Sequence, residues 1–276
     1  MSSWLITGCS TGLGRAFALA ALERGHRVAV TARDVDRVRD LVEAHPETAL
    51  ALQLDVTDDA QVTAAVAAAE ERFGGIDVLV NNAGYGHRAA VEEGEDEAVR
   101  RLWETHLFGA VRTIQAVLPG MRARRVGTIV NISSVAARSS PAGSGYYAAV
   151  KAAIEALTLS LRQEVEPLGL TAFAVAPGGF RTDFAGRSLT QAGTPIDDYA
   201  DTAGRRRKEH STVHGTQPGD PAKAAAAVID AVESGRPPYL LVLGNDASDR
   251  IRASLAAIQD DLDTWETVSR STDFDS

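Results

Sequence analysis

The amino-acid sequence predicts an α/β protein, a single domain over residues 1–276 built on one doubly wound parallel sheet of about seven strands. Short apolar runs alternate with helical patterns along the chain, which is the order of repeated strand–helix–strand units. Glycine and small polar residues follow several of the apolar runs, at the points where helices begin. No linker and no further internal repeat divides the chain, so one core is expected.

Seven segments carry a strand pattern. Each is a short, largely apolar run, and a run of this kind is typical of a strand buried within a parallel sheet. In order along the chain, the segments are residues 4–7, 27–33, 49–56, 76–80, 127–134, 170–176 and 239–243.

Helical patterns lie between these segments. Asp34 and the polar run at residues 57–59 are positioned as N-terminal caps of two of the helices. An amphipathic helix at residues 246–268 forms a C-terminal extension that reaches about residue 270, and residues 271–276 are expected to fray. The remaining helical patterns are at residues 15–24, 35–42, 59–73, after Glu95, and at 148–164 and 221–233.

Composition argues against several classes of function. The net charge of -9 opposes binding to nucleic acids, and the single cysteine, Cys9, allows no internal disulfide and suits a reducing compartment. The N-terminus lacks the basic segment of a signal peptide, and no apolar run approaches the ~18 residues that span a bilayer. We therefore expect a cytoplasmic protein without a metal site and without a membrane or nucleic-acid partner.

A glycine-rich loop follows the first apolar run. Residues 4–7 lead into Gly8, Gly12 and Gly14, and a helical pattern begins directly afterwards. A strand, a glycine turn and a helix in this order place backbone N–H groups and a positive helix end where a pyrophosphate can bind. The spacing of these glycines differs from the G-x-G-x-x-G pattern of many dinucleotide-binding proteins.

The same loop also fits a second motif. With Ser10 at its centre, the segment from Gly8 to Gly12 satisfies G-x-S-x-G, the nucleophile turn of serine hydrolases. A hydrolase needs an acid and a histidine at later strand ends, and none of the six histidines has that position in the pattern. A serine hydrolase that uses Ser10 therefore stays as an alternative. Cys9 is either an activated thiol or, as we favour, a small buried filler.

An acid–base pair is predicted at the start of a later helix. Tyr147 and Lys151 are four residues apart, so one helical turn stacks the ammonium beneath the phenol. A nearby cation favours the phenolate, and Lys151 is therefore expected to lower the pKa of Tyr147 from about 10. Ser134, at the carboxyl end of the strand at residues 127–134, can lie beside the phenol.

Together these motifs resemble those of the short-chain dehydrogenase/reductase family over about residues 3–245. Ser134, Tyr147 and Lys151 match the catalytic residues of that family, and residues 7–14 match its T-G-x-x-x-G-x-G coenzyme loop. The resemblance implies a Rossmann-type fold and an oxidoreductase that transfers a hydride between NAD(P)(H) and a carbonyl/alcohol pair. It implies that Ser134 binds the substrate oxygen, Tyr147 transfers its proton, and Lys151 binds the nicotinamide ribose.

The resemblance implies further coenzyme contacts as well. The Asp-Val pair at residues 55–56 would border the adenine, and the N-N-A-G sequence at residues 81–84 would let the backbone approach a ribose. In the P-G-x-x-x-T sequence at residues 177–182, Thr182 would contact the nicotinamide carboxamide. The expected coenzyme residues are Gly8, Ser10, Thr11, Gly12, Leu13, Gly14, Arg33, Asp55, Val56, Asn82, Ala83, Gly84, Tyr147, Lys151, Pro177, Gly178, Phe180 and Thr182.

The chain departs from the family at His106. Many members carry an asparagine in an N-x-x-G motif and use it to hold a proton-relay water, but this chain has H-L-F-G at residues 106–109. Histidine also holds water and titrates near neutral pH, so His106 can serve the relay as a catalytic group. It can equally be a packed, hydrogen-bonded helix residue. The replaced asparagine also keeps open a non-catalytic NADP(H)-binding sensor or regulator as an alternative function.

The end of the second strand decides which coenzyme is expected. An acid there binds the ribose 2′-hydroxyl of NAD, whereas an arginine pairs with the 2′-phosphate of NADP. By the resemblance the deciding position is Ala32, which is neutral, and Arg33 follows it. Arg15 can supply a second charge, and Asp34 fits a helix cap better than an NAD ligand. We therefore expect NADP(H), with NAD(H) as the alternative.

The substrate and the subunit contacts have weaker signatures. Residues 183–219 are polar and aperiodic, as expected of a lid, and the basic run at residues 205–208 either attracts an anionic substrate or faces solvent. The helix at residues 148–164 is rich in small side chains, and because the family pairs this helix between subunits we expect a homodimer or homotetramer. Four aromatic residues of the expected walls favour an apolar or ring-bearing carbonyl or alcohol substrate, namely Tyr85, Tyr146, Phe180 and Phe184.

Overall fold

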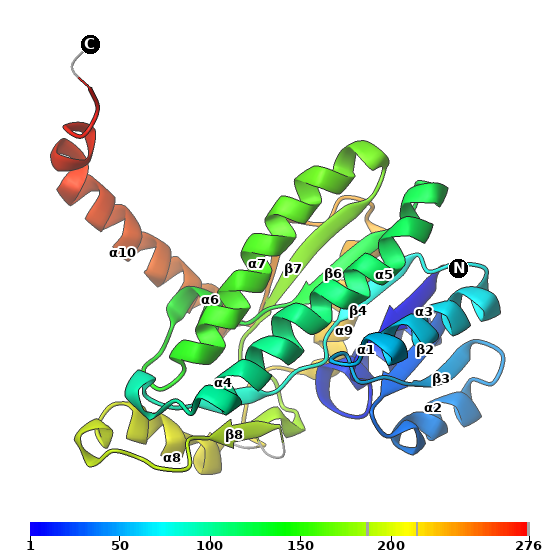
Figure 1. The fold of residues 1–276 in the computed structure, drawn as a ribbon, viewed down its shortest axis with the longest axis horizontal. Coiled ribbons are helices and arrows are strands. Elements are labelled where there is room, and N and C mark those ends of the chain that lie inside the picture. The colour runs from blue at the N-terminus through cyan, green and yellow to red at the C-terminus, as the bar shows by residue number, and fades with distance from the viewer. Residues whose placement is uncertain (186–187, 214, 275–276) are drawn as a thin grey trace.

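The computed structural model describes residues 1–185, 188–213 and 215–274 of the chain (Figure 1). A seven-stranded parallel sheet forms its centre. The strands are β1 (Ser3–Ile6), β2 (Arg27–Ala32), β3 (Ala49–Gln53), β4 (Val78–Asn81), β6 (Thr128–Ile132), β7 (Thr171–Pro177) and β9 (Leu240–Leu243). Their spatial order is β3-β2-β1-β4-β6-β7-β9. The second and third strands therefore lie on one side of β1, and the strands that follow in the sequence lie on its other side. This confirms the predicted doubly wound α/β fold and its seven strands.

Helices cover both faces of this sheet. One face carries α1 (Gly12–Glu23), α2 (Arg39–Ala44) and α9 (Pro221–Glu233), and the other carries α3 (Asp59–Phe73), α5 (Gly109–Arg124) and α7 (Gly145–Val165). Successive side chains of a strand point to opposite faces, so Trp4 and Ile6 enter the core beneath the first set and Leu5 enters the core beneath the second. All three are fully buried, and each such burial contributes about 2 kcal/mol.

Carboxylates cap the helices where the sequence predicts caps. Asp58 accepts hydrogen bonds from two N–H groups in the first turn of α3, at 2.9 and 3.1 Å. Asp34 accepts one from the backbone N–H of Asp36 at 3.2 Å and so caps the short turn before α2. Asp220, at which no cap was predicted, caps α9 in the same way. Each cap satisfies N–H groups that a helix start leaves without an intrahelical partner.

A buried chain of polar side chains ties the carboxyl ends of β4 and β6 to the helices above them. The side-chain amide of Asn81 donates a hydrogen bond to Asn131 on the neighbouring strand at 2.9 Å. Thr113 of α5 donates to Asn81 at 2.6 Å, and Asn131 donates to Thr158 of α7 at 2.8 Å. Because every member of the chain has a partner, these groups can be buried without a large desolvation cost, and they fix where α5 and α7 cross the sheet.

A second, two-stranded sheet lies outside the central one. In it β5 (Gly86–Arg88) pairs in parallel with β8 (Leu189–Gln191). Helix α8 (Ala203–Val213) lies near β8 at one end of the molecule (Figure 1), within the segment expected to be aperiodic. The helix is composed mostly of polar residues and lacks an apolar stripe, which is why periodicity did not predict it. Residues 186, 187 and 214 of the expected lid lie outside the described residues.

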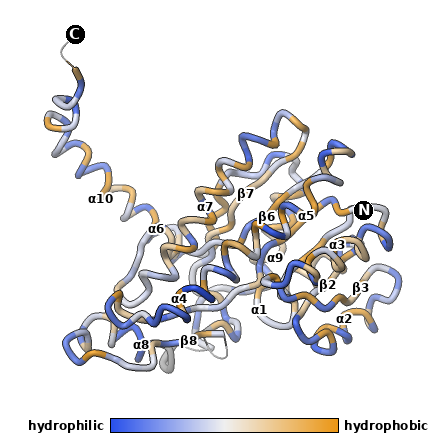
Figure 2. The backbone as a smooth tube through the Cα atoms, viewed as in Figure 1, coloured by the Kyte–Doolittle hydropathy of each residue, from blue (hydrophilic) through white to orange (hydrophobic). Residues whose placement is uncertain are grey.

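The last helix, α10 (Asn245–Arg270), begins on the molecule and then projects from it (Figure 1). Its first turns bury Ala247 and Ile251 against the sheet edge and α6 (Ala136–Ser139). Figure 2 shows hydrophobic positions recurring along the projecting part. The helix predicted at residues 246–268 is therefore present, and the last two residues of the predicted frayed end lie outside the described ones. Among the described helices, none has the length and apolar character needed to cross a membrane.

A buried ion pair holds α8 to the body of the protein. The Glu93 side chain has no exposed surface and pairs with Arg207, whose side chain is 13% exposed. The same carboxylate accepts hydrogen bonds from the N–H groups of Ala90 at 2.8 Å and Ile196 at 2.9 Å. Burial by itself raises the pKa of Glu93, but these hydrogen bonds and Arg207 outweigh it and lower the pKa. The basic run at residues 205–208 was expected either to attract an anionic substrate or to face solvent. Arg207 does neither, because it is the buried ion-pair partner of Glu93.

We expect Arg207→Ala to open the α8 segment without unfolding the sheet, because it leaves the buried Glu93 carboxylate without its cation. Removing one partner of a buried pair costs about 3 kcal/mol, so local opening should increase at least about tenfold. Limited proteolysis with mass spectrometry would detect this as faster cleavage within residues 188–213. Arg205→Ala is the matched control, since the Arg205 side chain on the same helix is 73% exposed. Equal cleavage of the two variants would contradict the role of the pair.

Candidate active site

The residues predicted to form the site meet at the carboxyl ends of the central strands. Because the strands are parallel, the loops after β1, β4, β6 and β7 all leave the sheet at this edge. These loops carry the glycine turn, residues 82–84, Ser134 and residues 178–182. The start of α7 adds Tyr147 and Lys151. The sheet topology therefore gathers side chains that are far apart in the sequence.

The glycine loop forms a cradle at the N-terminus of α1. Gly8 and Gly12 have φ angles of +74° and +63°, a region that residues with a side chain rarely adopt. A Cβ atom at Gly14 would overlap the side-chain amide of Asn82 and the carbonyl oxygen of Gly8. The side chain of Thr11 does not cap the first turn of α1, and that turn contains no acid. Its N–H groups can therefore bind an anion, which fits the pyrophosphate of a dinucleotide.

Two side chains fix the shape of this loop. The Asn82 amide donates hydrogen bonds to the carbonyl oxygens of Thr7 at 2.9 Å and Gly8 at 3.1 Å. In return, the Thr7 hydroxyl accepts hydrogen bonds from the N–H groups of Asn82 and Ala83, both at 2.9 Å. Thr7 is not among the coenzyme residues expected from the sequence, although the T-G pair that opens the motif marks it. The ends of β1 and β4 thus hold each other in place.

The serine-hydrolase interpretation gains no support from the surroundings of Ser10. No histidine whose side chain the structure describes hydrogen-bonds to Ser10, and His26 and His87 bond to other side chains. Cys9 is fully buried and donates a hydrogen bond to the carbonyl oxygen of Ile6 at 3.2 Å. Burial raises the pKa of the Cys9 thiol to about 12, so it is a packed and unreactive filler.

Ser134, Tyr147 and Lys151 come together at the centre of the site. The Ser134 hydroxyl lies near enough to the Tyr147 phenol to affect its pKa, and the Nζ atom of Lys151 lies 5.7 Å from the centre of the phenol ring. Lys151 also donates a hydrogen bond to the carbonyl oxygen of Ile132, at the end of β6, at 2.7 Å. Ser134 accepts a hydrogen bond from the N–H of Ala136 at 3.1 Å, which fixes its position. A hydroxyl, a phenol and an amine thus share one site.

Burial controls the pKa values of this group. It raises the pKa of Tyr147 to about 12, although the nearby Ser134 hydroxyl acts in the opposite direction. It lowers the pKa of Lys151 to about 7, although the carboxylate of Glu155 raises it. The expectation that Lys151 lowers the pKa of the phenol is therefore wrong for this structure. Both groups lose water on burial, and the lysine directs its hydrogen bond to a backbone carbonyl instead of the phenol.

His106 lies on a π-helical turn, Glu104–Phe108, between α4 (Asp96–Trp103) and α5. Its Nε2 atom is 2.7 Å from the carbonyl oxygen of Tyr85 and 3.0 Å from the backbone nitrogen of the same residue. Burial, together with the charge of Lys151, holds the pKa of His106 well below its usual value. The ring is therefore a neutral, hydrogen-bonded group at pH 7.

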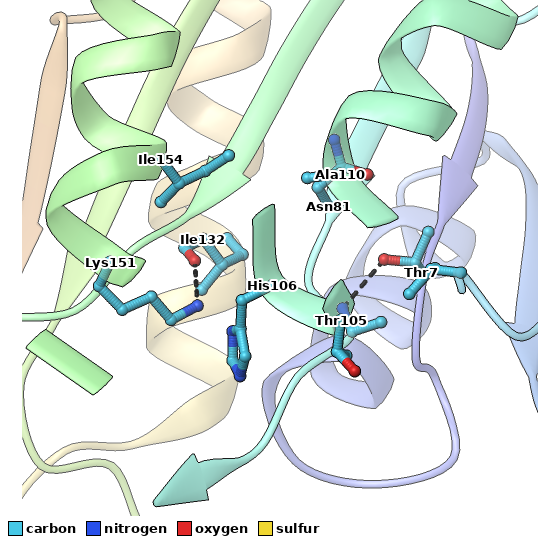
Figure 3. A pocket seen from close by; sticks show the side chains of 10 residues that line it. Thr7, Asn81, Thr105, His106, Ala110, Ile132, Lys151 and Ile154 are labelled. Carbon is cyan, nitrogen blue, oxygen red and sulfur yellow. Dashed lines mark hydrogen bonds between the residues drawn. The ribbon is translucent and has the colours of Figure 1, made fainter. Parts of the chain in front are cut away.

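His106 and Lys151 lie side by side at a small cavity (Figure 3). The cavity has a volume of about 10 Å³, which is room for roughly one water molecule. The Nδ1 atom of His106 is buried and has no partner among the described residues, and its ring packs edge-on against Tyr147 with the centroids 5.8 Å apart. A Cβ atom at Gly84 would overlap the imidazole, so Gly84 makes room for His106, a role not expected from the sequence. The cavity is also lined by Thr7, Val56, Asn81, Ala83, Thr105, Ala110, Ile132 and Ile154.

Glu155 is a member of the site that sequence reasoning missed. It lies one turn after Lys151 on α7, and its side chain is only 3% exposed. The carboxylate accepts hydrogen bonds from the Ser133 hydroxyl and from Nε of Arg138, both at 2.6 Å. Arg138 in turn donates to the Tyr239 hydroxyl. The four-residue spacing between Lys151 and Glu155, which places both on one helix face, is the signal that could have identified it.

The loop after β7 is held by the first turn of α10. The N–H of Gly179 donates a hydrogen bond to the carboxylate of Asp246 at 2.8 Å, and a Cβ atom at Gly178 would overlap that carboxylate. Further along the loop, the Cβ atom of Thr182 lies 3.7 Å from the place that a Cβ atom at Gly12 would occupy. Thr182 is therefore adjacent to the glycine loop.

Two of the four expected aromatic residues lie near the catalytic groups. Phe184 packs against the phenol of the site with ring centroids 6.1 Å apart, and Tyr85 lies 5.6 Å from the ring of His106. The other two have different partners. Tyr146 donates its hydroxyl to a backbone carbonyl at 2.6 Å, and Phe180 packs against the core beneath α1 and α9. Phe180 therefore supports the loop from the core side.

The end of β2 presents an exposed arginine. Ala32 is buried, whereas Arg33 is exposed and no carboxylate of the described residues lies within ion-pair distance of it. Arg15, expected as a second charge, is instead paired with Asp40. Asp34 is occupied as a helix cap. Among the described residues, Arg33 is therefore an exposed cation without an ion-pair partner at this edge.

The remaining residues expected to bind coenzyme have packing or backbone roles. Val56 is buried and Leu13 packs against the core, while Asp55 accepts a hydrogen bond from the N–H two residues further on, at 2.9 Å. Pro177 ends β7, and its carbonyl oxygen accepts a hydrogen bond from Val135 at 3.0 Å. Within the described ranges, no three His, Cys, Asp or Glu side chains gather closely enough to hold a metal ion.

Known proteins match this chain over most of its length. A family profile described as short chain dehydrogenase matches residues 3–192. The solved structure of a short-chain dehydrogenase from Streptomyces avermitilis is 43% identical with a TM-score of 0.93, covering 99% of each chain. An oxidoreductase of Botryotinia fuckeliana is 36% identical over 96% of this chain and 97% of its own length. A 3-ketodihydrosphingosine reductase of Bacteroides thetaiotaomicron is 35% identical over 87% of each chain.

Lys151 should make the stability of the protein rise with pH between about 7 and 10.5. Its pKa falls from 10.5 to about 7 on folding, so within this window the unfolded chain binds more protons than the folded one. Raising the pH then favours the folded state, and between pH 7 and pH 9 the gain is about 2 kcal/mol. Urea unfolding at these two pH values measures the gain in the wild type and in Lys151→Met, where it should be absent.

Lys223→Met provides the control for this experiment. It also removes one lysine, but Lys223 is exposed. Its pH dependence should match that of the wild type. If Lys151→Met gained as much stability as the wild type over this window, the lowered pKa of Lys151 would be refuted.

Proposed function

This chain belongs to the short-chain dehydrogenase family of oxidoreductases, and from this premise we propose that it interconverts a carbonyl compound and an alcohol with a nicotinamide coenzyme. The observation that carries the proposal is the convergence of Ser134, Tyr147 and Lys151 beside the open glycine loop. No other group of described side chains at this sheet edge combines a proton donor, a hydrogen-bond donor and an amine in this way.

The coenzyme belongs at the N-terminus of α1. Gly8, Gly12 and the uncapped first turn of the helix suit its pyrophosphate, and Thr182, which is adjacent to Gly12, is the residue proposed to contact its nicotinamide. Lys151 is the residue proposed to hold the nicotinamide ribose. When bound, the coenzyme supplies or accepts the hydride.

Tyr147 is the proposed proton donor. With a pKa of about 12 it carries its proton at neutral pH, which suits donation to a substrate oxygen and so favours reduction of a carbonyl. The Ser134 hydroxyl donates a hydrogen bond to the same oxygen as negative charge develops, and a donor of this kind contributes about 3 kcal/mol to the transition state. Lys151, with a pKa of about 7, exchanges protons near neutrality and can restore the phenol.

We assign His106 to a proton relay behind Lys151. Both side chains border the small cavity, and a single water there would bridge the lysine amine and the imidazole Nδ1, which has no partner among the described residues. The family's asparagine would hold such a water as a neutral group. The imidazole stays neutral as well, because its pKa is lowered, so it can replace asparagine without adding charge beside Lys151.

We propose NADP(H) as the preferred coenzyme. Arg33 is exposed at the end of β2, and a guanidinium binds a phosphate through paired hydrogen bonds. An acid that would favour NAD is not free at this edge, because Asp34 caps the turn before α2. This assignment rests on Arg33 alone, since Arg15 is paired with Asp40.

The proposed substrate is a ketone or aldehyde with an apolar or ring-bearing part. Phe184, 40% exposed, lies against the Tyr147 ring, and Tyr85 lies beside His106, so apolar surface borders the reacting group. The name of the Bacteroides relative, a reductase of a 3-keto compound, agrees with this class. A homodimer or homotetramer is proposed through α7, whose outward face presents Ala149, Ala152, Ala156 and Ser160.

Tyr147→Phe should lower kcat for carbonyl reduction at least about a thousandfold, because it removes the proton donor and leaves the packing of the ring. The NADPH dissociation constant should stay within about twofold. Consumption of NADPH with a panel of ketones and aldehydes gives the rate, and fluorescence titration gives the affinity. Tyr146→Phe is the control, since that neighbouring hydroxyl bonds to a backbone carbonyl. Unchanged turnover in Tyr147→Phe would refute the assignment, and a wild type that binds NADPH but reduces no compound would indicate the sensor.

Arg33→Ala should weaken NADPH binding about tenfold and leave NADH binding unchanged, because only the 2′-phosphate needs the guanidinium. Separate titrations with the two coenzymes measure this difference. Arg15→Ala serves as the comparison and should change neither value by more than about twofold. A parallel loss of NADPH and NADH affinity in Arg33→Ala would show that Arg33 does not select the coenzyme.

A further inference from the structure

The outer part of α10 is a helix in contact with nothing else that the structure describes. The first turns of α10 are held to the protein: Ser254 donates a hydrogen bond to the carbonyl oxygen of Arg138 at 2.6 Å, and Arg250 donates one to Ser139 at 2.8 Å. From residue 255 to residue 274 every residue is exposed. We call residues 255–270 the arm, which is about 24 Å long as a helix and is visible projecting from the body in Figure 1.

Large apolar side chains form one line along this arm. They continue the line of Ile251 at alternating steps of four and three residues, and this spacing keeps them on one face of a helix that pairs with another. Exposed apolar residues in such a line are uncommon on a monomer and indicate an interface. A lone helix of this length would also be marginally stable in water. The line, which we call the arm stripe, consists of Leu255, Ile258, Leu262 and Trp265, which are 54%, 54%, 59% and 59% exposed.

The charges on α10 indicate what covers the stripe. The inner half carries two acids and two arginines and so has no net charge, whereas the outer half is acidic, with acids at positions 260, 261, 263 and 266 and one arginine at position 270. A second copy laid parallel would place acidic half against acidic half, whereas an antiparallel copy would place each acidic half beside the half without net charge, which carries Arg250 and Arg252. The α10 helix of a second copy, in antiparallel orientation, therefore fits both the spacing of the stripe and the uneven distribution of charge.

One pair of residues tests this arrangement directly. Arg252 follows Ile251 by one position and Glu266 follows Trp265 by one position, so both flank the stripe on the same side. In an antiparallel pair with its twofold axis near Gln259, Arg252 of one copy lies opposite Glu266 of the other. Glu266 is bonded within its own helix to Arg270, but this is an exposed pair that exchanges at little cost.

The polar face of the arm argues against a membrane surface as the occupant. Helices that lie on membranes carry mainly lysine and arginine opposite their apolar face, because lipid surfaces are often anionic. The corresponding face here is acidic, in a chain whose net charge is -9. An anionic bilayer would therefore repel the arm.

We propose that the arm is a dimerisation element, in which two copies of this chain pair their α10 helices antiparallel through the arm stripe. This contact is separate from the α7 face. It joins two copies of any assembly formed through α7 and so doubles the number of subunits. It does not depend on the proposed catalytic function.

The first test compares two variants that each add one negative charge to the arm of the full-length protein. Leu262→Glu places the charge in the stripe, and Thr267→Glu places it on the opposite face of the same helix. Sedimentation equilibrium should show the mass of the wild-type assembly reduced by half in Leu262→Glu, or its dissociation constant raised at least tenfold, and unchanged in Thr267→Glu. A monomeric wild type, or equal masses for the wild type and Leu262→Glu, would overturn the proposal.

The second test fixes the orientation. Arg252→Glu and Glu266→Arg should each weaken association about threefold to tenfold at low salt, and the double variant should recover the wild-type value to within about twofold. A double variant weaker than both single variants would refute the antiparallel pair. Flotation with vesicles of phosphatidylcholine and phosphatidylserine covers the membrane alternative, and binding that is lost in Leu262→Glu would overturn the proposal in favour of that surface.

Discussion

Burial of the Lys151 amine is the constraint on which the rest of this site depends. A buried amine must be compensated, and here the carbonyl at the end of β6 accepts its hydrogen bond while the negative charge of Glu155, one turn along α7, favours its protonated form. Glu155 is buried in turn, so it requires Ser133 and Arg138. One charged group in the core thus determines how α7 and α6 lie against the sheet, and it couples the site to elements that never touch a substrate.

The fold was predictable from the sequence because its main elements are stabilised by periodic apolar burial. Alternation places Trp4 and Leu5 on opposite faces of one strand, and the same rule holds for each central strand. The small sheet of β5 and β8 and the helix α8 were not predicted, because another kind of interaction holds them. Arg207 on a polar helix reaches a fully buried Glu93, and no repeat in the sequence identifies such a pair.

The sequence predicted which residues meet in the site, but it did not predict the direction in which the pKa of Tyr147 is shifted. Spacing brings Tyr147 and Lys151 onto one helix face, and strand topology brings Ser134 to them. Spacing gives no information about solvent, however, so the direction of the phenol pKa was wrong: burial raises it, and only Ser134 acts against this. Local motifs also do not reveal distant neighbours, which is why the contact between Gly84 and the imidazole of His106 was not predicted.

The π-helical turn Glu104–Phe108 contains one residue more than an α-helical turn would, and α4 and α5 continue directly from its two ends. Deleting a single residue there would restore the α-helical phase and rotate His106 by about 100° with respect to α5, away from the Tyr85 backbone. The placement of this imidazole is therefore encoded in the length of the helix as well as in the identity of the side chain. In related chains, an insertion or deletion between α4 and α5 would remove the ring from the cavity even where the histidine itself is retained.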